Sequence, residues 1–502
     1  MFEKKSLQKI NNFFLTGLLF VSFLFVPIIT QAIERVSVSS LGVEGDGNPA
    51  GDEVIVISED GRYVLFNSSA TNLVAGDTNT FDDLFIYDRT SNTLERLLDG
   101  LSIQGDADTG GGISISANNR FVAFSSSATN LVAGDTNGVQ DIFVYDRTND
   151  TIERVSVSSL GAEGDSASNF SSISGNGEYV TFGSNAQNLV SGDTSRVDMF
   201  IHTLATGSTE IISRNSLGTT SNGDSGEKAS DISSDGRYVT FQSFATDLVA
   251  GGTLASSHVY VYDQTNQILT LASTNTLSIE GNNASAAPSL SSDGASVTFS
   301  SLATNLVTGD TNGYYDVFRK DLSTGETIRI SISDTGIESD NASILSSLSA
   351  DGCYGAFLSY ATNLITGDTN ALPDIYVVAL CVSTPTVSPQ TNSSRTPIIT
   401  GTWDAADATE LEVTIGGTTY TLSDSELTTP SSGTWSLDLS STPLNAGTTY
   451  EVLVTNSNLF DSASDTTTNE ISITQNSSGG GGSTSGSLPI FGCRDPLATN
   501  YN

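Results

Sequence analysis

The sequence predicts an all-β chain in which a six-bladed β-propeller is followed by a β-sandwich. The main observation is a segment that recurs six times, each copy opening with an Ile-Ser or Leu-Ser pair and a tight polar turn. The openings are 58 or 59 residues apart and stand at Ile57, Ile115, Ile173, Ile232, Leu290 and Leu348. Each copy holds four short apolar runs, which is the number of strands in one propeller blade.

The first copy shows how the four strands follow one another. A run ending at Ile57 and the run 62–66 flank a tight turn and are expected to pair as a hairpin. A longer loop leads to the third strand at 83–88, and a polar turn leads to the fourth at 93–98. The third strand is apolar on both faces, as expected for a sheet that packs between two neighbours. One aromatic side chain of the second strand recurs and is expected in the core: Phe66, Phe124, Phe182, Phe241, Phe299 and Phe357.

The ring is expected to close through its N-terminal strand. The sixth copy ends with its third strand at 374–380, and nothing that resembles a fourth strand follows. Residues 33–42 nearly duplicate 152–161, which is a fourth strand with its connecting loop. The first segment is therefore predicted to complete the last blade, a velcro closure that leaves no free strand edge. The propeller spans 33–381.

The sequence of one repeated turn and the strand after it resembles the signature of a known family. Residues 234–241 read Ser-Asp-Gly-Arg-Tyr-Val-Thr-Phe and resemble the S-D-G-x-x-[VIL]-A/T-F signature of TolB-like six-bladed propellers. Members of that family serve as periplasmic scaffolds, as gates on peptidases and as binding platforms, so the resemblance implies an architecture and no particular activity. Neither a TolB-type N-terminal domain nor a hydrolase domain is recognisable, and the resemblance therefore implies a scaffold or a binder.

The N-terminal residues and the charge indicate an exported protein. Three lysines precede the apolar run 13–29, and Thr30-Gln31-Ala32 supplies small residues where a signal peptidase cuts, so 1–32 is read as a signal peptide. Cleavage would leave no transmembrane span. The protein is then expected at the cell surface, outside the cell, or in the periplasm of a two-membrane envelope. With 57 acidic and 19 basic residues, the net charge is −38, which excludes nucleic acid as a partner.

Two of the three cysteines fall at matching strand ends. Cys353 opens the second strand of the sixth copy and Cys381 closes its third strand, so antiparallel pairing brings them together. In other copies an Arg–Asp pair occupies these positions and is expected to bridge the same two strands, as with Arg62 and Asp88. The sixth copy holds either a disulfide or two reduced thiols.

The remaining chain divides into four parts. Residues 382–395 are rich in Pro, Ser and Thr and are predicted to be a linker. Residues 396–475 contain short strands around a Gly-Gly turn and resemble bacterial Ig-like β-sandwich domains, with Trp403 and Trp435 expected in the core. A Gly/Ser linker follows at 476–487. Residues 488–502 resemble the opening of a Cys-containing motif of exported bacterial proteins, so the chain is a fragment or Cys493 pairs with another molecule.

The loop between the second and third strands carries the best candidate for a metal site. It reads Gly-Asp-Thr-Asn-x-x-x-Asp in four copies, and oxygen donors at positions 1, 3 and 7 suit calcium. The candidate calcium ligands are Asp77, Asn79, Asp83, Asp135, Asn137, Asp141, Asp310, Asn312, Asp316, Asp368, Asn370 and Asp374. The alternative is that Asp and Asn cap turns without a metal. The third and fourth copies depart from the motif and are not expected to bind.

The residues favour a binding protein over an enzyme. The chain has two histidines, His202 and His258, and neither belongs to a recognisable triad or zinc motif. We expect no catalytic residue and no cofactor apart from calcium. The first hypothesis is a monomeric scaffold whose propeller face binds a protein or a surface glycan, in protein interaction or adhesion. The second is a carbohydrate-active hydrolase or lyase at the propeller channel, with Glu53 and Asp231 as isolated acids.

Overall fold

The computed structural model describes residues 36–47, 55–101, 103–193, 196–333, 335–368, 372–431 and 433–475. In these ranges the chain is all-β, and a single 3-10 turn, η1 (Asp99–Leu101), interrupts the strands. No helix in the described ranges is long and apolar enough to cross a membrane. The predictions for 1–32, 476–487 and 488–502, and for Glu53, Asn370 and Cys493, lie outside the described residues.

The first unit consists of six consecutive antiparallel sheets, numbered here along the chain, with the strands of each sheet in sequence order. Sheet 1 contains β1 (Val56–Ile57), β2 (Tyr63–Ser68), β3 (Asp83–Asp88) and β4 (Thr93–Arg96). Sheet 2 contains β5 (Thr109–Ile115), β6 (Phe121–Ser126), β7 (Asp141–Asp146) and β8 (Thr151–Arg154). Sheet 3 contains β9 (Ser168–Ile173), β10 (Tyr179–Ser184), β11 (Asp198–Thr203) and β12 (Ser208–Ile211). Sheet 4 contains β13 (Ser225–Ile232), β14 (Tyr238–Ser243), β15 (His258–Asp263) and β16 (Ile268–Leu271). Sheet 5 contains β17 (Ser285–Leu290), β18 (Ser296–Ser301), β19 (Asp316–Asp321) and β20 (Thr327–Arg329), and sheet 6 contains β21 (Ser343–Leu348), β22 (Tyr354–Ser359) and β23 (Asp374–Ala379).

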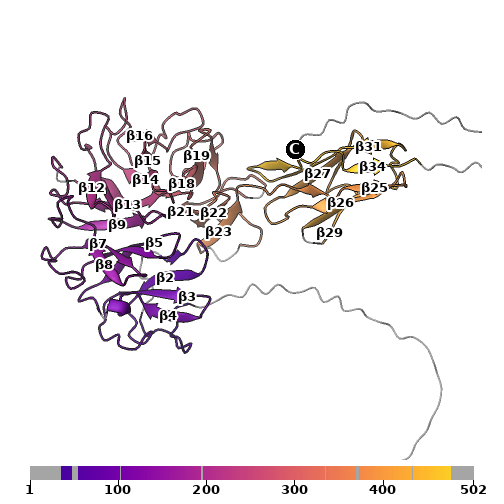
Figure 1. The fold of residues 1–502 in the computed structure, drawn as a ribbon. Coiled ribbons are helices and arrows are strands. Elements are labelled where there is room, and N and C mark those ends of the chain that lie inside the picture. The colour runs from indigo at the N-terminus through magenta and orange to yellow at the C-terminus, as the bar shows by residue number, and fades with distance from the viewer. Residues whose placement is uncertain are drawn as a thin grey trace, which may run out of the picture.

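The sheets are arranged as in a propeller. Figure 1 shows β4, β8, β12 and β16 at the rim, and β5, β9, β13 and β21 toward the middle. Apolar side chains fill the spaces between successive sheets; Leu84 and Ile86 of sheet 1, for example, pack with Phe124 and Phe143 of sheet 2. The third strand therefore has to be apolar on both faces, because each face contacts a different neighbour.

The recurring aromatic residues are core residues, as predicted. The side chains of the six phenylalanines are at most 3% exposed. Each stacks on an aromatic ring of the third strand, with ring centroids 5.6 to 6.0 Å apart. The predicted Arg–Asp bridges also form, with Arg62 and Asp88 2.6 Å apart in sheet 1 and the equivalent pairs in sheets 2 and 4. These contacts lock the second and third strands of a sheet together.

A short hairpin precedes most sheets and covers the outer edge of the sheet that follows. The hairpins are marked by isolated bridges such as Val38 to Glu44 and Val157 to Glu163. The Ser159 hydroxyl of the second accepts a hydrogen bond from the Thr209 amide of β12 at 2.9 Å. Segments that belong to one sequence repeat are thus bonded to the sheet of the next repeat.

Sheet 6 differs from the other five sheets. It has three strands in the described residues, and Ile375 and Val377 of β23 are 77% and 69% exposed. Ile142 and Val144, at the same positions of β7, are 0% and 2% exposed. The segment predicted to supply the fourth strand, 33–35, lies outside the described residues.

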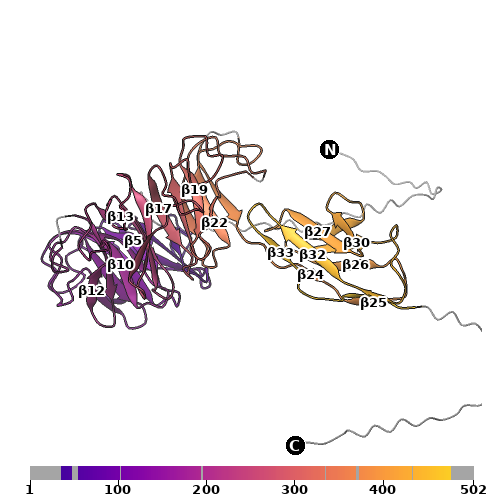
Figure 2. The same cartoon turned by 90° about the horizontal axis from the view of Figure 1, so that it is seen from above.

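The second unit is an antiparallel β structure with one parallel strand pair, β25 with β34. One sheet has the order β24 (Thr386–Val387), β26 (Ile398–Thr402), β30 (Thr434–Asp438), β29 (Leu427–Ser431). A second has the order β28 (Thr418–Thr421), β27 (Glu410–Ile415), β32 (Val452–Ser457), β33 (Ser462–Ser464), and a third has β25 (Gln390–Asn392), β34 (Ile471–Ile473), β31 (Thr448–Tyr450). Figure 2 shows this unit beside sheets 5 and 6.

The structure corrects the linker predicted at 382–395. This segment forms β24 and β25, and Val382 and Val387 are buried in the core of the second unit. The Pro-rich and Ser/Thr-rich composition is compatible with edge strands, because proline is tolerated where no ladder hydrogen bond is needed. Trp403 and Trp435 are 9% and 0% exposed, in agreement with the predicted core role.

Candidate functional site

A pocket of about 550 Å³ lies where the first strands of all six sheets meet. Each sheet contributes the same two positions, and in sheets 2 to 6 these are a polar residue followed by an aliphatic one, such as Ser114 with Ile115 and Ser289 with Leu290. Sheet 1 has Val56 and Ile57 there. Small residues of the following turns, Glu59, and Tyr354, Ala356 and Val377 of sheet 6 also line the pocket. The repeat therefore produces a belt of hydroxyl groups around the propeller axis.

The belt side chains join neighbouring sheets through hydrogen bonds. The Ser114 hydroxyl accepts a bond from the Ile173 amide at 2.9 Å, and the Ser289 hydroxyl accepts one from the Leu348 amide at 3.3 Å. Asp231 takes the same position in sheet 4, and its carboxylate accepts a bond from the Leu290 amide at 2.9 Å. The polar belt consequently has a structural role in addition to lining the pocket.

Asp231 is the acid predicted to face the channel, and it does line the pocket. Burial raises the pKa of its carboxyl group, while hydrogen bonds from the amides of Leu290 and Ile232 and from the hydroxyls of Ser289 and Ser172 oppose that rise. A carboxylate held by four donors joins sheets 3, 4 and 5. Both of its carboxylate oxygens therefore already accept hydrogen bonds within the protein.

The other acid of the pocket is Glu59, which the sequence analysis did not single out. Its carboxylate accepts a hydrogen bond from the Ser292 hydroxyl at 2.6 Å, which joins sheet 1 to sheet 5 across the axis. Among the described residues that line the pocket there is no His, Lys, Arg or Cys. The described lining therefore offers hydroxyl and amide groups for binding, with two carboxylates that already have donors.

The predicted calcium loops bring carboxylates together around an arginine. In sheet 2, the Arg154 guanidinium nitrogen Nη1 lies 3.1 Å from Asp135, 3.2 Å from Asp141 and 2.9 Å from Glu163. In sheet 5, Nη1 of Arg329 lies 3.7, 3.2 and 2.7 Å from Asp310, Asp316 and Glu338. In sheet 1, Arg96 pairs with Asp77 and Asp83 in the same way.

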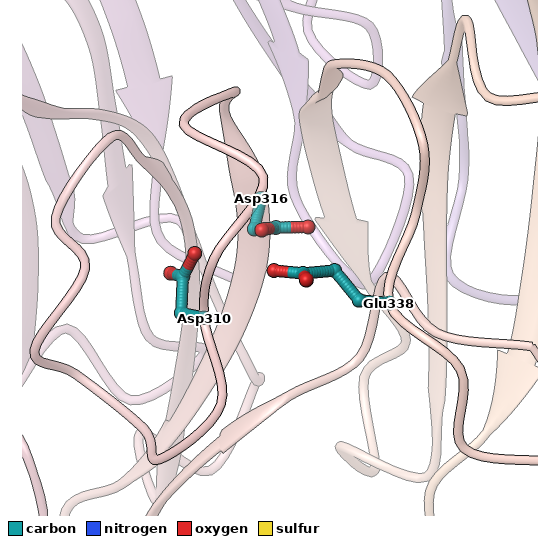
Figure 3. A group of neighbouring side chains, drawn as sticks. All are labelled: Asp310, Asp316 and Glu338. Carbon is teal, nitrogen blue, oxygen red and sulfur yellow. The ribbon is translucent and has the colours of Figure 1, made fainter.

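Figure 3 shows the three acids of sheet 5 converging, with Asp310 and Asp316 from one loop and Glu338 from the following hairpin. Their carboxylate oxygens lie within 4.8 Å of one another. Burial and the adjacent Asp316 raise the pKa of Asp310 to about 6. Burial opposes ionisation of Glu338 as well, but hydrogen bonds from Thr311 and Arg329 hold its pKa at about 2.

The asparagine of the motif does not turn its oxygen toward the acids. The carboxamide oxygens of Asn79, Asn137 and Asn312 accept hydrogen bonds from the backbone amides of Phe81, Val139 and Tyr314. The amide nitrogens of Asn137 and Asn312 donate to Asp141 and Asp316 at 2.9 and 3.0 Å. Positions 1 and 7 converge as predicted, whereas position 3 shapes the turn. Calcium at these loops remains a prediction.

The arginine and the glutamate of the cluster were missed by sequence reasoning. Their signal was present, because Arg ends the fourth strand in three copies and Glu recurs in the hairpin that follows. Asp368 and Asp374 of sheet 6 form the remaining pair, and Arg35 is the residue of the N-terminal segment that corresponds to Arg154.

His202, His258, Cys353 and Cys381 do not line the pocket. Burial lowers the pKa of His202 to about 4, and its ring bonds to the Thr209 hydroxyl at 2.8 Å. His258 is fully buried and contacts Glu280 at 3.0 Å. Cys353 and Cys381 are joined in a disulfide with Cα atoms 4.9 Å apart. These residues tie strands together.

Comparisons with known proteins concern the fold. No family model and no curated protein matches the chain. TolB from Acinetobacter baumannii is 17% identical with a TM-score of 0.34, over 56% of this chain and 58% of that one. A putative TolB from Agrobacterium tumefaciens is 17% identical with a TM-score of 0.35, over 55% and 79% of the two chains. Oligogalacturonate lyase from Vibrio parahaemolyticus is 9% identical with a TM-score of 0.40, over 65% and 76%.

This chain thus spans little more than half of the first TolB structure. TolB-like propeller proteins are among the solved structures that resemble the chain, and its antiparallel sheets fit a propeller. Scores this low carry no functional argument.

Proposed function

We propose that the chain is an exported, non-catalytic binding or scaffold protein that takes its ligand at the central pocket and on the loops around it. The observation that carries this proposal is the pocket lining. Aliphatic side chains alternate with serine hydroxyls around it, and both carboxylates that face it accept hydrogen bonds from protein donors. Such a lining suits recognition of a polar ligand, such as a protein loop or a glycan, better than proton transfer to a substrate.

The propeller is proposed to have six blades, closed by residues 33–35 as the fourth strand of sheet 6. Two observations support the closure. Ile375 and Val377 of β23 are exposed where Ile142 and Val144 of β7 are covered by the next sheet, so closing the ring against sheet 1 would bury them, and the hairpin from Val38 to Glu44 forms as its counterparts do in later repeats. In this closure Arg35 would lie between Asp368 and Asp374, as Arg154 lies between Asp135 and Asp141.

The second unit is proposed to be an Ig-like module that spaces the propeller from the C-terminal residues. Asn458 of this unit donates a hydrogen bond to the Ala379 carbonyl of β23 at 3.2 Å, and Phe460 packs against the apolar cluster of sheets 5 and 6. These contacts hold the second unit against sheet 6, so the unit would fix the orientation of the propeller relative to the C-terminal residues.

The proposal is tested by site-specific cross-linking combined with an activity assay. A photoreactive residue in place of Ser234 or Ser292, both in the pocket lining, should capture an envelope ligand. The same residue in place of Leu160, which is 98% exposed on a hairpin tip, should not. Capture at Leu160 alone, or at neither place, would oppose a pocket ligand.

The activity assay tests the alternative of a carbohydrate-active enzyme. Full-length protein incubated with oligogalacturonate and other acidic or neutral polysaccharides should release no new reducing or unsaturated ends. Turnover that disappears in Asp231→Ala or Glu59→Gln would replace the binding proposal with a glycan-active site in the channel.

A further inference from the structure

Sheet 3 keeps the aspartate pair of the loop clusters but lacks the arginine. Its pair is Asp193 and Asp198, and the last residue of β12 is Ile211, which pairs with Phe200 as Arg154 pairs with Phe143 in sheet 2. Ile211 is 5% exposed and belongs to the apolar core between sheets. The position of the third acid is taken by Thr220, which bridges to Arg214 as Glu338 bridges to Ile332.

The carboxylate of Asp198 is left with one unsatisfied oxygen. Its Oδ1 accepts a hydrogen bond from the Ser213 hydroxyl at 2.6 Å, exactly the contact that Ser331 makes with Asp316 in sheet 5. Its Oδ2 is buried and accepts no hydrogen bond within the described part of the chain, and the whole residue is 0% exposed. Asp198 also forms no ion pair with a described residue.

The equivalent oxygen in sheets 2 and 5 has two donors. Oδ2 of Asp141 accepts from Asn137 at 2.9 Å and lies 3.2 Å from Arg154. Oδ2 of Asp316 accepts from Asn312 at 3.0 Å and lies 3.2 Å from Arg329. The loop of sheet 3 is one residue shorter and has no asparagine, so both donors are absent together.

Against the expectation from the motif, we infer that the Asp193–Asp198 pair of sheet 3 binds a divalent cation of the calcium class at the position that an arginine nitrogen occupies in sheets 2 and 5. A buried ionised oxygen without a partner is strongly unfavourable, so this position requires a positive charge or a proton. Two carboxylates and the neighbouring hydroxyl of Ser221 are hard oxygen donors, which suit calcium. The Ser221 hydroxyl donates to the Gly223 carbonyl at 2.8 Å and lies 3.5 Å from Oδ1 of Asp198, so its oxygen is close to the pair.

The electrostatics of Asp198 agree with cation binding. Burial raises the pKa of Asp198 to about 7, and the carboxyl group of Asp193 beside it adds to the rise. An adjacent cation would remove this repulsion. The inference is independent of the ligand proposed for the central pocket, because the pair lies in a loop between the second and third strands.

The test is calcium calorimetry on the full chain at pH 7.5 in 0.15 M salt, with parallel melting in calcium and in chelator. We expect saturable binding that includes a site in sheet 3, and a higher melting temperature in calcium. Ile211→Arg supplies the guanidinium that sheets 2 and 5 carry, and it should abolish the site while raising the melting temperature in chelator. Asp198→Asn should abolish the site as well, which keeps the test valid if the arginine variant does not fold.

Glu210→Gln is the matched control, because it removes an exposed acid next to Ile211 without touching the pair. This variant should bind calcium as the unmodified chain does. Absence of saturable heat, or a site that survives both Ile211→Arg and Asp198→Asn, would overturn the inference. Stability that falls between pH 6 and pH 8 equally with and without calcium would show that the pair shares a proton instead, and would overturn it too.

Discussion

Replacing Arg329 with methionine tests whether the arginine is the structural cation of its loop cluster. The Arg329 side chain is 9% exposed, and Asp310, Asp316 and Glu338 around it are 3%, 0% and 18% exposed. Methionine keeps much of the packing volume but leaves three acids facing one another. Removing one partner of a buried ion pair typically costs about 3 to 5 kcal/mol, and we expect a loss of that size at pH 8.

The loss should be smaller at pH 5. The pKa of Asp310 is about 6, above its ordinary value of 3.8, so its ionisation opposes folding as the pH rises through 6. Without the arginine this pKa rises further, and each additional unit adds about 1.4 kcal/mol to the difference between pH 8 and pH 5. The stability difference between the unmodified chain and Arg329→Met should therefore become smaller as the pH falls from 8 to 5.

Urea unfolding at the two pH values measures the effect, and the chain provides an internal control. Both tryptophans, Trp403 and Trp435, lie in the second unit, so their fluorescence reports that unit alone. Far-ultraviolet circular dichroism reports the propeller as well. The matched control is Arg62→Met, whose ion pair with Asp88 is 45% exposed on the arginine side, so its loss should matter much less than loss of the buried Arg329.

Equal losses for Arg329→Met at pH 8 and pH 5, or a loss no larger than that of Arg62→Met, would refute the reasoning. A shift of the tryptophan transition alone would refute it as well, because the effect would then belong to the second unit.

Other expected outcomes concern the belt, the disulfide, the closure and the calcium loops. Asp231→Ala should lower the free energy of unfolding of the propeller by about 2 to 4 kcal/mol, since several amide and hydroxyl donors lose a charged acceptor. A decrease below about 0.5 kcal/mol, measured by circular dichroism, would contradict this. Reduction of the Cys353–Cys381 bond, which encloses a separation of 28 residues, should cost about 3 to 4 kcal/mol in the same assay, with Cys353→Ala/Cys381→Ala as the check that the reductant acts there. Arg35→Met should destabilise the propeller and leave the tryptophan transition unchanged; no effect would oppose closure by residues 33–35. Calorimetry should show that Arg329→Met binds more calcium than the unmodified chain does, and no increase would favour the loops as turn structures without metal.

The sequence was sufficient for the repeat and for the residues that the repeat buries. A period of 58 or 59 residues with four apolar runs specifies successive sheets, and an aromatic residue at a fixed place in every copy has to be core. The Arg–Asp bridges followed for the same reason, because antiparallel pairing fixes which strand ends meet.

The clusters could not be assembled from one repeat at a time. Glu163 lies in the segment after Arg154, and this segment folds back over the loop that holds Asp135. Contacts of that kind depend on the path of a hairpin, which hydrophobic periodicity does not encode. The linker prediction was wrong for a related reason: Val382 and Val387 are two isolated apolar residues, and only the packing of the second unit shows that they are buried.

Because each hairpin binds the following sheet, the repeat that is duplicated in the sequence differs from the structural unit, which is a sheet together with the hairpin of the preceding repeat. Ser159 belongs to the repeat of sheet 2 by sequence, yet it is bonded to Thr209 in sheet 3. A duplicated repeat therefore already contains the hairpin that binds the outer edge of the next sheet. Its own sheet can be bound by the hairpin of the repeat before it. Addition of a repeat by gene duplication therefore needs no new interface. Deletion of the residues of one sheet alone would leave one hairpin without a sheet to bind and the outer edge of one sheet uncovered.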